Sequence, residues 1–394
     1  MPETAPPSLP RVVRSLGWVS LLTDASSDMI YPLLPAFLRT IGGGGAALGV
    51  MEGIAESIGA LVKWRAGIAS DRRGRRKPFV VTGYAIATLV RPLLALATAP
   101  LHVVLVRSVD RVGKGLRSAP RDAILGHAVP PEQRAAAYGY HRMMDNAGAV
   151  VGPLLAFLLA RYAGFSMRMV FAAAIVPGLL AMAMLLFRVK EPAAPRLSSA
   201  PADAPIVPSA VEERQLRRYL AVVALFTLGA SADSFLLLRI TDLGLPAAWV
   251  PLVWLSLNAS KSATNIPGGR TADKIGRRLA LVLAWLVYAA AYLSFPFTSS
   301  IAVTWVLIVA YGAYYGLAEG AEKAIVADLA PRAHRGRAFG MLHAVTGLAI
   351  LPANAIFGVL YAKHAALAFY SSAACAALAA VALFVMVPAT VKPR

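Results

Sequence analysis

Long apolar runs recur throughout this chain and limit what it can fold into. A membrane-spanning helix needs about 20 mainly apolar residues, and twelve segments meet that requirement. They are residues 14–38, 46–66, 78–98, 101–121, 136–160, 166–187, 218–240, 248–268, 279–297, 301–326, 338–361 and 366–387. Hydrophobic residues make up 58% of the chain and charged residues only 15%, which is more apolar surface than a soluble core can bury. The sequence therefore predicts an all-α membrane protein with twelve transmembrane helices.

Basic residues are distributed unevenly along the chain. The formal net charge is +19, which in a soluble protein would suggest nucleic-acid binding. Here Lys and Arg gather in the loops after the second, eighth and tenth segments and in residues 188–217, while the opposite loops are nearly bare. Because positive loops stay in the cytoplasm, we expect the 188–217 linker and both termini, 1–13 and 388–394, to be cytoplasmic. This predicts a bacterial inner (plasma) membrane protein with no nucleic-acid partner, whose first span remains as an anchor because no cleavable signal peptide is evident.

The linker divides the apolar segments into six and six, so we expect two six-helix bundles, residues 14–187 and 218–387. A repeated motif supports this division. Each copy has a Gly, an Asp four residues later, a second Gly three residues after that, and a basic cluster. The first copy contains Gly67, Asp71, Arg72, Gly74 and Arg75, and the second contains Gly269, Asp273, Gly276 and Arg277. Regions around Asp28 and Asp233 repeat at nearly the same separation, which indicates duplication of a six-helix unit.

This pattern resembles the major facilitator superfamily, in which such a motif joins helices two and three and is repeated between helices eight and nine. The resemblance covers the whole chain and implies secondary active transport by two pseudo-symmetric six-helix bundles. It also implies that Asp71 and Arg75 hold a cytoplasmic gate closed, with Asp273 and Arg277 as their counterparts. In this family the motif's Asp pairs with arginines and with a helix N-terminus. The alternative is that both motifs are only positively charged anchors.

Two spans carry further family features. Gly148, Gly152 and Pro153 resemble the Gly-x-x-x-Gly-Pro motif of the family's antiporters. Small residues four apart let helices approach closely, and Pro bends a helix. The second Gly pair of that motif is absent, so the match that favours antiport is partial. The fourth span, which contains Arg107 and Asp110, departs from the family pattern and resembles a bacterial subgroup, some members of which are linked to metal or metal-chelate handling.

Ionisable side chains occur inside the predicted spans. Each costs about 2.5–3.5 kcal/mol in the hydrocarbon core, so it should face a cavity or a partner. Asp24 and Asp28 share one face of the first span, and Lys261 lies in the eighth. One interpretation is a set of ion pairs that fix helix register, and the other is a proton relay with a substrate cavity. The candidate cavity residues are Asp28, Glu52, Glu56, Arg107, Asp110, Arg111, His141, Asp145, Asp233 and Glu319.

The functional expectation is proton-coupled antiport that exports a small solute by alternating access, carried out by a monomer in the lipid bilayer. No phosphate-binding loop is evident, so ATP-driven transport is not expected. Neither an enzyme, a cofactor nor a metal site is expected, and Cys375 is the single cysteine. Acidic residues on the first two spans suit a cationic cargo, whereas the basic fourth span suits an anionic one. The alternatives are an importer or symporter, a metal or metal-chelate permease, and a membrane sensor that does not transport.

Overall fold

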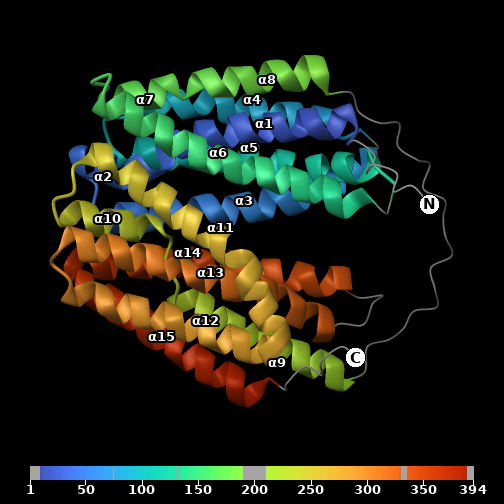
Figure 1. Cartoon of the computed structure of the whole chain (residues 1–394), viewed down its shortest axis with the longest axis vertical. Coiled ribbons are helices and arrows are strands. Elements are labelled where there is room, and N and C mark those ends of the chain that lie inside the picture. Colours follow the sequence, from blue (N-terminus) through green and yellow to red (C-terminus); the bar gives the residue numbers. More distant parts are fainter. Residues whose placement is uncertain (1–8, 74, 131–132, 190–209, 330–334, 388–394) are drawn as a thin grey trace, which may run out of the picture. The chain divides into compact units, whose positions relative to one another are not determined.

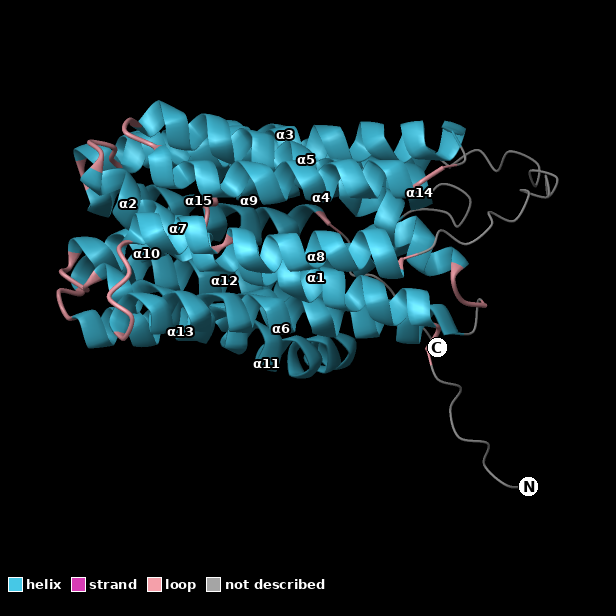
Figure 2. Cartoon of the chain, turned by 90° about the horizontal axis from the view of Figure 1, so that it is seen from above, coloured by secondary structure: helices cyan, strands magenta, loops and turns pink. Residues whose placement is uncertain are grey.

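The computed structural model describes residues 9–73, 75–130, 133–189, 210–329 and 335–387. Every regular element within these residues is helical, as the apolar runs predict, and the connecting loops are short (Figures 1 and 2). The elements are α1 (Arg11–Ile30), η1 (Tyr31–Leu33), α2 (Leu34–Thr40), α3 (Gly45–Arg73), α4 (Lys77–Val90), η2 (Arg91–Leu96), α5 (Pro100–His127), α6 (Arg134–Arg161), α7 (Met167–Ala173), α8 (Ile175–Arg188), α9 (Ala210–Gly229), α10 (Ser234–Asp242), η4 (Ala247–Trp249), α11 (Val250–Ile275), α12 (Arg277–Ser294), η5 (Phe295–Phe297), α13 (Ile301–Leu329), α14 (Arg335–Lys363) and α15 (Ala365–Met386).

Nine helical segments among the described residues are long and apolar enough to cross a membrane. They are Gly45–Ser70, Lys77–Leu96, Ala137–Arg161, Met167–Arg188, Glu213–Asp242, Arg277–Phe297, Ile301–Leu329, Ala338–Lys363 and Ala365–Met386. The predicted spans at 14–38, 101–121 and 248–268 do not reach this apolar threshold, and they correspond to α1, α5 and α11. These three helices are long enough, but many of their side chains are polar. Polar groups at membrane depth need protein or water around them, so these helices are expected to line the protein interior.

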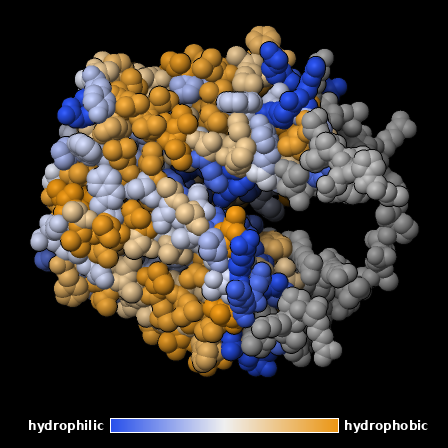
Figure 3. All heavy atoms as spheres, in the orientation of Figure 1, coloured by the Kyte–Doolittle hydropathy of each residue, from blue (hydrophilic) through white to orange (hydrophobic). Residues whose placement is uncertain are grey.

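Large apolar side chains are exposed on the outside of the helices. Leu96, Val306 and Val385 have exposed fractions of 73%, 67% and 74%, and Figure 3 shows hydrophobic residues over much of the face in view. Water would leave such surfaces prone to aggregation, whereas lipid chains are as apolar as the side chains themselves. The surface therefore agrees with a multi-pass membrane protein.

The described chain forms two compact units. The first comprises described residues up to 31 together with those in 61–97 and 105–200, and the second comprises those in 32–60, 98–104 and 201–394. The second unit therefore includes α2 and the first part of α3 along with the C-terminal half of the chain. The boundaries of the two bundles at 14–187 and 218–387 remain a prediction.

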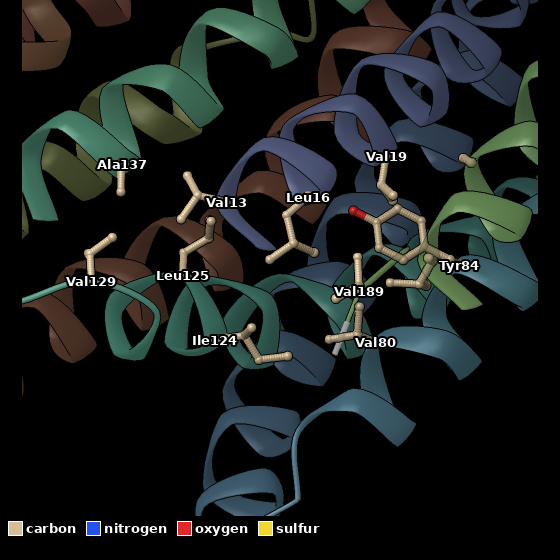
Figure 4. Close-up of a cluster of buried hydrophobic side chains, with 12 residues drawn as sticks. Val13, Leu16, Val19, Val80, Tyr84, Ile124, Leu125, Val129, Ala137 and Val189 are labelled. Carbon is tan, nitrogen blue, oxygen red and sulfur yellow. The ribbon is translucent and has the colours of Figure 1, made fainter. Parts of the chain in front are cut away.

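A hydrophobic core holds the first unit together where α1, α4, α5, α6 and α8 meet. Val13 and Leu16 of α1 pack with Val80 and Tyr84 of α4 and with Leu125 of α5, and each is at most 1% exposed (Figure 4). Close packing of this kind is what associates helices inside a bilayer, because lipid removes the hydrophobic driving force between them. The core fixes α1 and α5, which carry Asp24, Asp28 and Asp110.

Helix α6 crosses α1 at Gly148 and Gly152. A Cβ atom at Gly148 would lie 2.5 Å from the carbonyl oxygen of Leu21, and one at Gly152 would lie 2.5 Å from that of Ala25. Only glycine leaves room for the backbones to approach this closely. Pro153 follows directly within α6, so all three residues of the partial antiporter motif lie at or beside this helix contact.

Two predicted spans are interrupted rather than continuous. The first breaks into α1, η1 and α2 at Pro32, which has no N–H to continue the helix. The seventh breaks at residues 230–233, between α9 and α10, where there is no proline. Here the Ser231 amide donates to the Tyr288 hydroxyl at 3.2 Å, and the Ala232 amide donates to Asn354 Oδ1 at 2.8 Å. Side chains of α12 and α14 thus replace the hydrogen bonds lost at the break, as a membrane interior requires.

Within the second unit, segments from the two ends of the sequence pack together. The Ser57 hydroxyl of α3 donates to the carbonyl oxygen of Gly347 on α14 at 2.9 Å. Helix α2 lies against α10 (Figure 1), where Arg39 Nη2 donates to both carboxylate oxygens of Asp242 at 2.9 and 2.8 Å. The Tyr361 hydroxyl donates to the same carboxylate at 2.8 Å. Residues 32–60 are therefore joined to α10 and α14 by polar contacts as well as by packing.

Candidate functional site

Asp110 on α5 is the centre of a buried ion-pair cluster in the first unit. Its Oδ1 accepts from Arg91 Nε at 2.8 Å and its Oδ2 from Arg107 Nη1 at 3.2 Å, and each of these side chains is at most 5% exposed. Arg91 Nη1 also donates to the carbonyl oxygen of Thr23 at 3.0 Å, and the Arg107 guanidinium lies 5.0 Å from the ring centre of Tyr31. The cluster therefore connects α1, η2 and α5. A cavity of about 10 Å³ beside it, which Asp110 and both arginines line, has room for about one water molecule.

Asp24 and Asp28 differ from Asp110 in having no direct partner within the part of the chain that the structure describes. They lie one turn apart on α1, and both side chains are partly exposed. Within the described residues neither carboxylate forms an ion pair or a hydrogen bond. The charges that act on Asp28 without touching it include those of Asp24, Lys114 and Arg107. These two carboxylates can gain or lose a proton without breaking a direct ion pair.

A second polar network joins α1, α5 and α6. His141 Nδ1 lies 3.4 Å from Asp145 Oδ1, and the same oxygen accepts a hydrogen bond from the Ser20 hydroxyl. Arg121 Nη1 donates to the Ser20 oxygen at 3.4 Å and binds Asp122 at 2.9 Å through Nη2. The other ring nitrogen of His141, Nε2, is buried and has no hydrogen-bond partner within the described chain. Asp145 is thus shared between a histidine and a hydroxyl, both of which have an exchangeable hydrogen.

Asp233 is the centre of the corresponding cluster in the second unit. It stands at the helix break, immediately before α10, and is 8% exposed. Lys261 Nζ on α11 lies 2.5 Å from its Oδ2, and the hydroxyls of Tyr311 and Tyr315 on α13 both donate to its Oδ1 at 3.0 Å. The same ammonium lies 3.9 Å from the ring centre of Tyr315 and 5.2 Å from that of Trp254. One carboxylate therefore gathers a cation and two hydroxyl groups from two other helices.

The remaining predicted cavity residues occupy varied positions. Glu52 and Glu56 lie in the part of α3 that belongs to the second unit, Glu52 buried and Glu56 partly exposed. Arg111 is buried on α5 in the first unit. Glu319 pairs with Lys323 one turn along α13, at 3.1 Å, on a side chain that is 39% exposed. The structure brings Arg107 together with Asp110, and His141 with Asp145. The structure also pairs Asp233 with Lys261. The sequence predicts Lys261 only as a charge inside the eighth span.

The first copy of the repeated motif ends α3. Gly67 lies near Ala119 of α5, and Arg72 and Arg75 are exposed. The side chain of Asp71 and the whole of Gly74 lie outside the described residues. The pairing expected for Asp71 and Arg75 therefore stays a prediction.

The second copy ends α11 and begins α12. Gly276 has φ of +94°, a conformation that favours glycine, while Gly269 has open space around it. Asp273 is exposed and forms no ion pair within the described residues. Arg277 instead binds Asp328 of α13. In the first half, Arg76, the residue after Arg75, lies near His127 of α5, with Nη1 and Nδ1 3.5 Å apart.

Several polar partners were not predicted. Arg91 lies in the predicted third span and obeys the same rule that picked out Arg107, so a complete search for intramembrane charge would have found it. Ser20, Tyr311 and Tyr315 gave no such signal, because hydroxyl-bearing residues are common in membrane helices and most pack without a charged partner. Within the described part of the chain, no group of three or more His, Cys, Asp or Glu residues is arranged to hold a metal ion.

Comparisons with known proteins agree with this fold. The Major Facilitator Superfamily profile matches residues 16–260 and 255–394. An uncharacterised MFS-type transporter of Methanocaldococcus jannaschii is 33% identical over 361 residues, which cover 90% of this chain and 89% of the relative. The multidrug resistance protein MdtH of Photorhabdus laumondii is 31% identical over 165 residues, 39% of this chain and 40% of the relative. A structure of a mutant of the nucleoside transporter NupG matches the fold with a TM-score of 0.82 at 12% identity, covering 96% of this chain and all of that one.

The helical fold, the apolar surface and the charged interior define a class of protein, the secondary transporters of small molecules. The chain belongs to the major facilitator superfamily. It is thus a multi-pass membrane protein that moves a small-molecule substrate, and not an enzyme.

Proposed function

We propose that this transporter exchanges protons for its cargo, and that it exports the cargo from the cytoplasm across the inner (plasma) membrane as a monomer. The proposal of proton coupling rests on the surroundings of the Asp24 and Asp28 carboxylates. Both carboxylates are partly exposed on α1 and have no direct ion-pair partner in the described chain. Close carboxylates in a poorly solvated site favour binding of a proton to one of them. Binding a proton at Asp24 or Asp28 therefore does not break a direct ion pair within the described chain.

The other buried carboxylates are less suited to this role. Asp110 is held by Arg91 and Arg107, and removing its charge would leave two guanidiniums buried without their counter-charge. We therefore assign Asp110 and Arg107 to the framework of the cavity, and Asp28 to the proton pathway. The Asp145–His141 pair lies on the adjacent helix α6 and is the second candidate for proton transfer, since an imidazole ring in contact with a carboxylate can pass a proton between its two nitrogens and that carboxylate.

Antiport is preferred to symport for two reasons. The partial Gly148–Gly152–Pro153 motif resembles that of antiporters, and its two glycines lie at the α1–α6 contact, next to the helix that carries Asp28. The similarity to MdtH, although confined to 39% of this chain, is to a protein named for multidrug resistance. An importer or symporter, or a metal-chelate permease, has the same fold and remains the alternative.

The test is transport into vesicles that contain the purified full-length protein. A pH difference is imposed, and the movement of protons and of a solute panel (ethidium, a nucleoside, a sugar and a ferric chelate) is followed in parallel. Antiport predicts that protons and cargo move in opposite directions. Asp28→Asn should abolish acceleration by the pH difference while leaving exchange of labelled for unlabelled cargo.

A matched control is Glu213→Gln, which removes an exposed carboxylate at the start of α9, 43% exposed and paired with Arg217. It should leave both assays unchanged. Movement of protons and cargo in the same direction would overturn antiport in favour of symport. No movement of any solute, with intact folded protein, would favour a sensor.

A further inference from the structure

The cluster around Asp233 resembles a filled cation site. The Lys261 ammonium sits 2.5 Å from a carboxylate oxygen and 3.9 Å from the ring centre of Tyr315, with the ring centre of Trp254 at 5.2 Å. A carboxylate combined with aromatic ring faces is the arrangement by which proteins recognise organic cations, because the negative face of each ring attracts positive charge. We propose that Asp233, Tyr315 and Trp254 form a binding site for a monovalent organic cation, and that Lys261 occupies this site as a tethered substitute when no cargo is bound.

The position of the site in the fold favours this assignment. Asp233 stands where the seventh span is broken, at residues 230–233. Interrupted helices in transporters commonly mark substrate sites near the middle of the membrane. Lys261 itself is reachable, since its side chain is 18% exposed and its neighbour Ser262 on α11 is exposed. The side chain of Lys261 is therefore not sealed off from an approaching cargo.

The donors around Asp233 argue for a cationic rather than an anionic cargo. Tyr311 and Tyr315 both donate their hydroxyls to Asp233, so the carboxylate stays anchored whichever cation it faces. An anionic cargo would have to draw Lys261 away and leave Asp233 buried without a counter-charge, which is costly. A cationic cargo leaves the carboxylate paired throughout.

Exchange of the two cations also gives a route for proton coupling, and in this respect the inference rests on the proposed antiport. A cargo cation beside Lys261 disfavours a second positive charge. The N–H bond of the Lys261 ammonium then breaks, the electron pair stays on nitrogen, and the proton leaves to solvent. The site keeps the same net charge, so one proton is released for each cation bound, and the reverse step discharges the cargo.

Among the described residues, the titratable groups that interact with Asp233 include five tyrosines. They are Tyr288 and Tyr292 on α12 and Tyr311, Tyr314 and Tyr315 on α13. Among the described residues, Asp233 is the carboxylate in contact with Lys261. Tyrosine hydroxyls keep their protons around neutral pH, so the proton released within this cluster is assigned to Lys261, in addition to the proton pathway assigned to Asp28.

Two substitutions of Lys261 separate this role from a purely structural one. Arginine keeps the charge and the ion pair but does not lose its proton in a protein, so Lys261→Arg should block the site permanently. Lys261→Gln removes the competing cation and should leave the site open. We therefore expect at least tenfold weaker binding of ethidium, a monovalent organic cation, in Lys261→Arg, and binding at least as tight as wild type in Lys261→Gln. A lysine that only stabilises the fold predicts the opposite order.

The measurement uses the purified full-length protein in detergent, with ethidium binding followed by fluorescence anisotropy and proton release by a pH indicator in weak buffer. The wild type should release about one proton per ethidium bound. Asp233→Asn and Tyr315→Leu should each weaken binding by tenfold or more, whereas Lys323→Arg, an exposed lysine on α13, should change nothing. Thermal unfolding of every variant shows that the comparison is made on folded protein.

The outcomes are distinguishable from failure of the antiport proposal. Ethidium binding with no proton release, wild-type affinity in Lys261→Arg, or no ethidium binding at all would each overturn the cation site, even if vesicles still exchanged protons for another solute. Tight binding of benzoate that strengthens in Asp233→Asn would show an anion site instead. Ethidium binding with proton release, but without opposed movement of protons and ethidium in vesicles, would support the site and count against antiport.

Discussion

At the scale of single residues, the charged groups inside this transporter fall into those held by direct partners and those that are not. Asp110, Asp145 and Asp233 each contact a positively charged or hydroxyl side chain. Asp24 and Asp28 do not, within the described residues. A buried carboxylate with two guanidinium partners stabilises a particular arrangement of helices, whereas one with no direct partner is free to change its charge.

The first prediction concerns Asp110. Asp110→Asn leaves Arg91 and Arg107 buried without their counter-charge, so we expect the free energy of unfolding to fall by about 3–5 kcal/mol. Reversible unfolding of the purified protein in mixed micelles measures this loss. Glu213→Gln, which breaks an exposed pair, should cost less than about 1 kcal/mol. Equal losses in the two variants would show that the Asp110 cluster adds nothing beyond a surface pair.

The sequence located many of these charges but not their partners. Arg107 and Asp110 lie three residues apart on one helix, so their contact follows from helical spacing. The contact of Lys261 with Asp233 joins two helices whose relative rotation is set by packing. Helical periodicity says which residues share a face, but it does not say which face of another helix they meet.

At the scale of elements, helix length was easier to predict than helix continuity. The apolar runs marked where the helices lie, and Pro32 explains the interruption between α1 and α2. The break at residues 230–233 has no such local cause, because it is held open by Tyr288 and Asn354 from other helices. Contacts of that kind form only in the folded protein, so a single span gives no sign of them.

The second prediction compares two glycines on α6. At Gly152 a methyl group would meet the carbonyl oxygen of Ala25, whereas at Gly139 it would meet nothing within 4 Å. Gly152→Ala should therefore lower the free energy of unfolding by about 1–3 kcal/mol. Gly139→Ala should be neutral or stabilise by up to about 1 kcal/mol, because alanine favours helix more than glycine does. Thermal unfolding of both variants tests this, and a similar shift for each would mean that α1 and α6 are not in close contact.

The third prediction concerns the pairing of α2 with α10. Arg39 and Asp242 are 46% and 25% exposed, and exposed pairs contribute little. A double-mutant cycle with Arg39→Gln and Asp242→Asn should give a coupling energy of about 0.2–1 kcal/mol. It should shrink in about 1 M salt, where charges are screened over about 3 Å. A coupling that exceeds this range and ignores salt would point to a link buried more deeply than the structure describes.

At the scale of the whole molecule, the duplication seen in the sequence does not extend to every contact beside the repeated motif. Arg277 binds Asp328, whereas in the first half Arg76, the residue after the motif counterpart Arg75, lies near His127. The two contacts also differ in chemistry, since one is an ion pair and the other involves a histidine. The repeat predicted the architecture, whereas the residues that differ between its copies are where the function has to be sought.

The fourth prediction is the orientation of the chain in the membrane. The excess of Lys and Arg on one side predicts cytoplasmic termini. Green fluorescent protein fused after Arg394 should therefore be fluorescent, and alkaline phosphatase fused at the same place should be inactive. Alkaline phosphatase inserted at Gly43, in the loop after α2, should be active. The reverse pattern would overturn the proposed orientation and with it the proposed direction of export.

The contact between α3 and α14 has a consequence for how the protein is made. Ser57 and Gly347 are 290 residues apart in sequence, and ribosomes add about 5–20 residues per second. The interval between synthesis of α3 and synthesis of its partner helix α14 is therefore about 15–60 s. Until then, the glycine-lined face of α3, which includes Gly49 and Gly53, has no partner helix. During that interval lipid, or a membrane chaperone, has to cover it. Completion of the second unit is thus set by the emergence of one of the last helices, and a chain truncated before α14 should be a target for quality-control proteolysis.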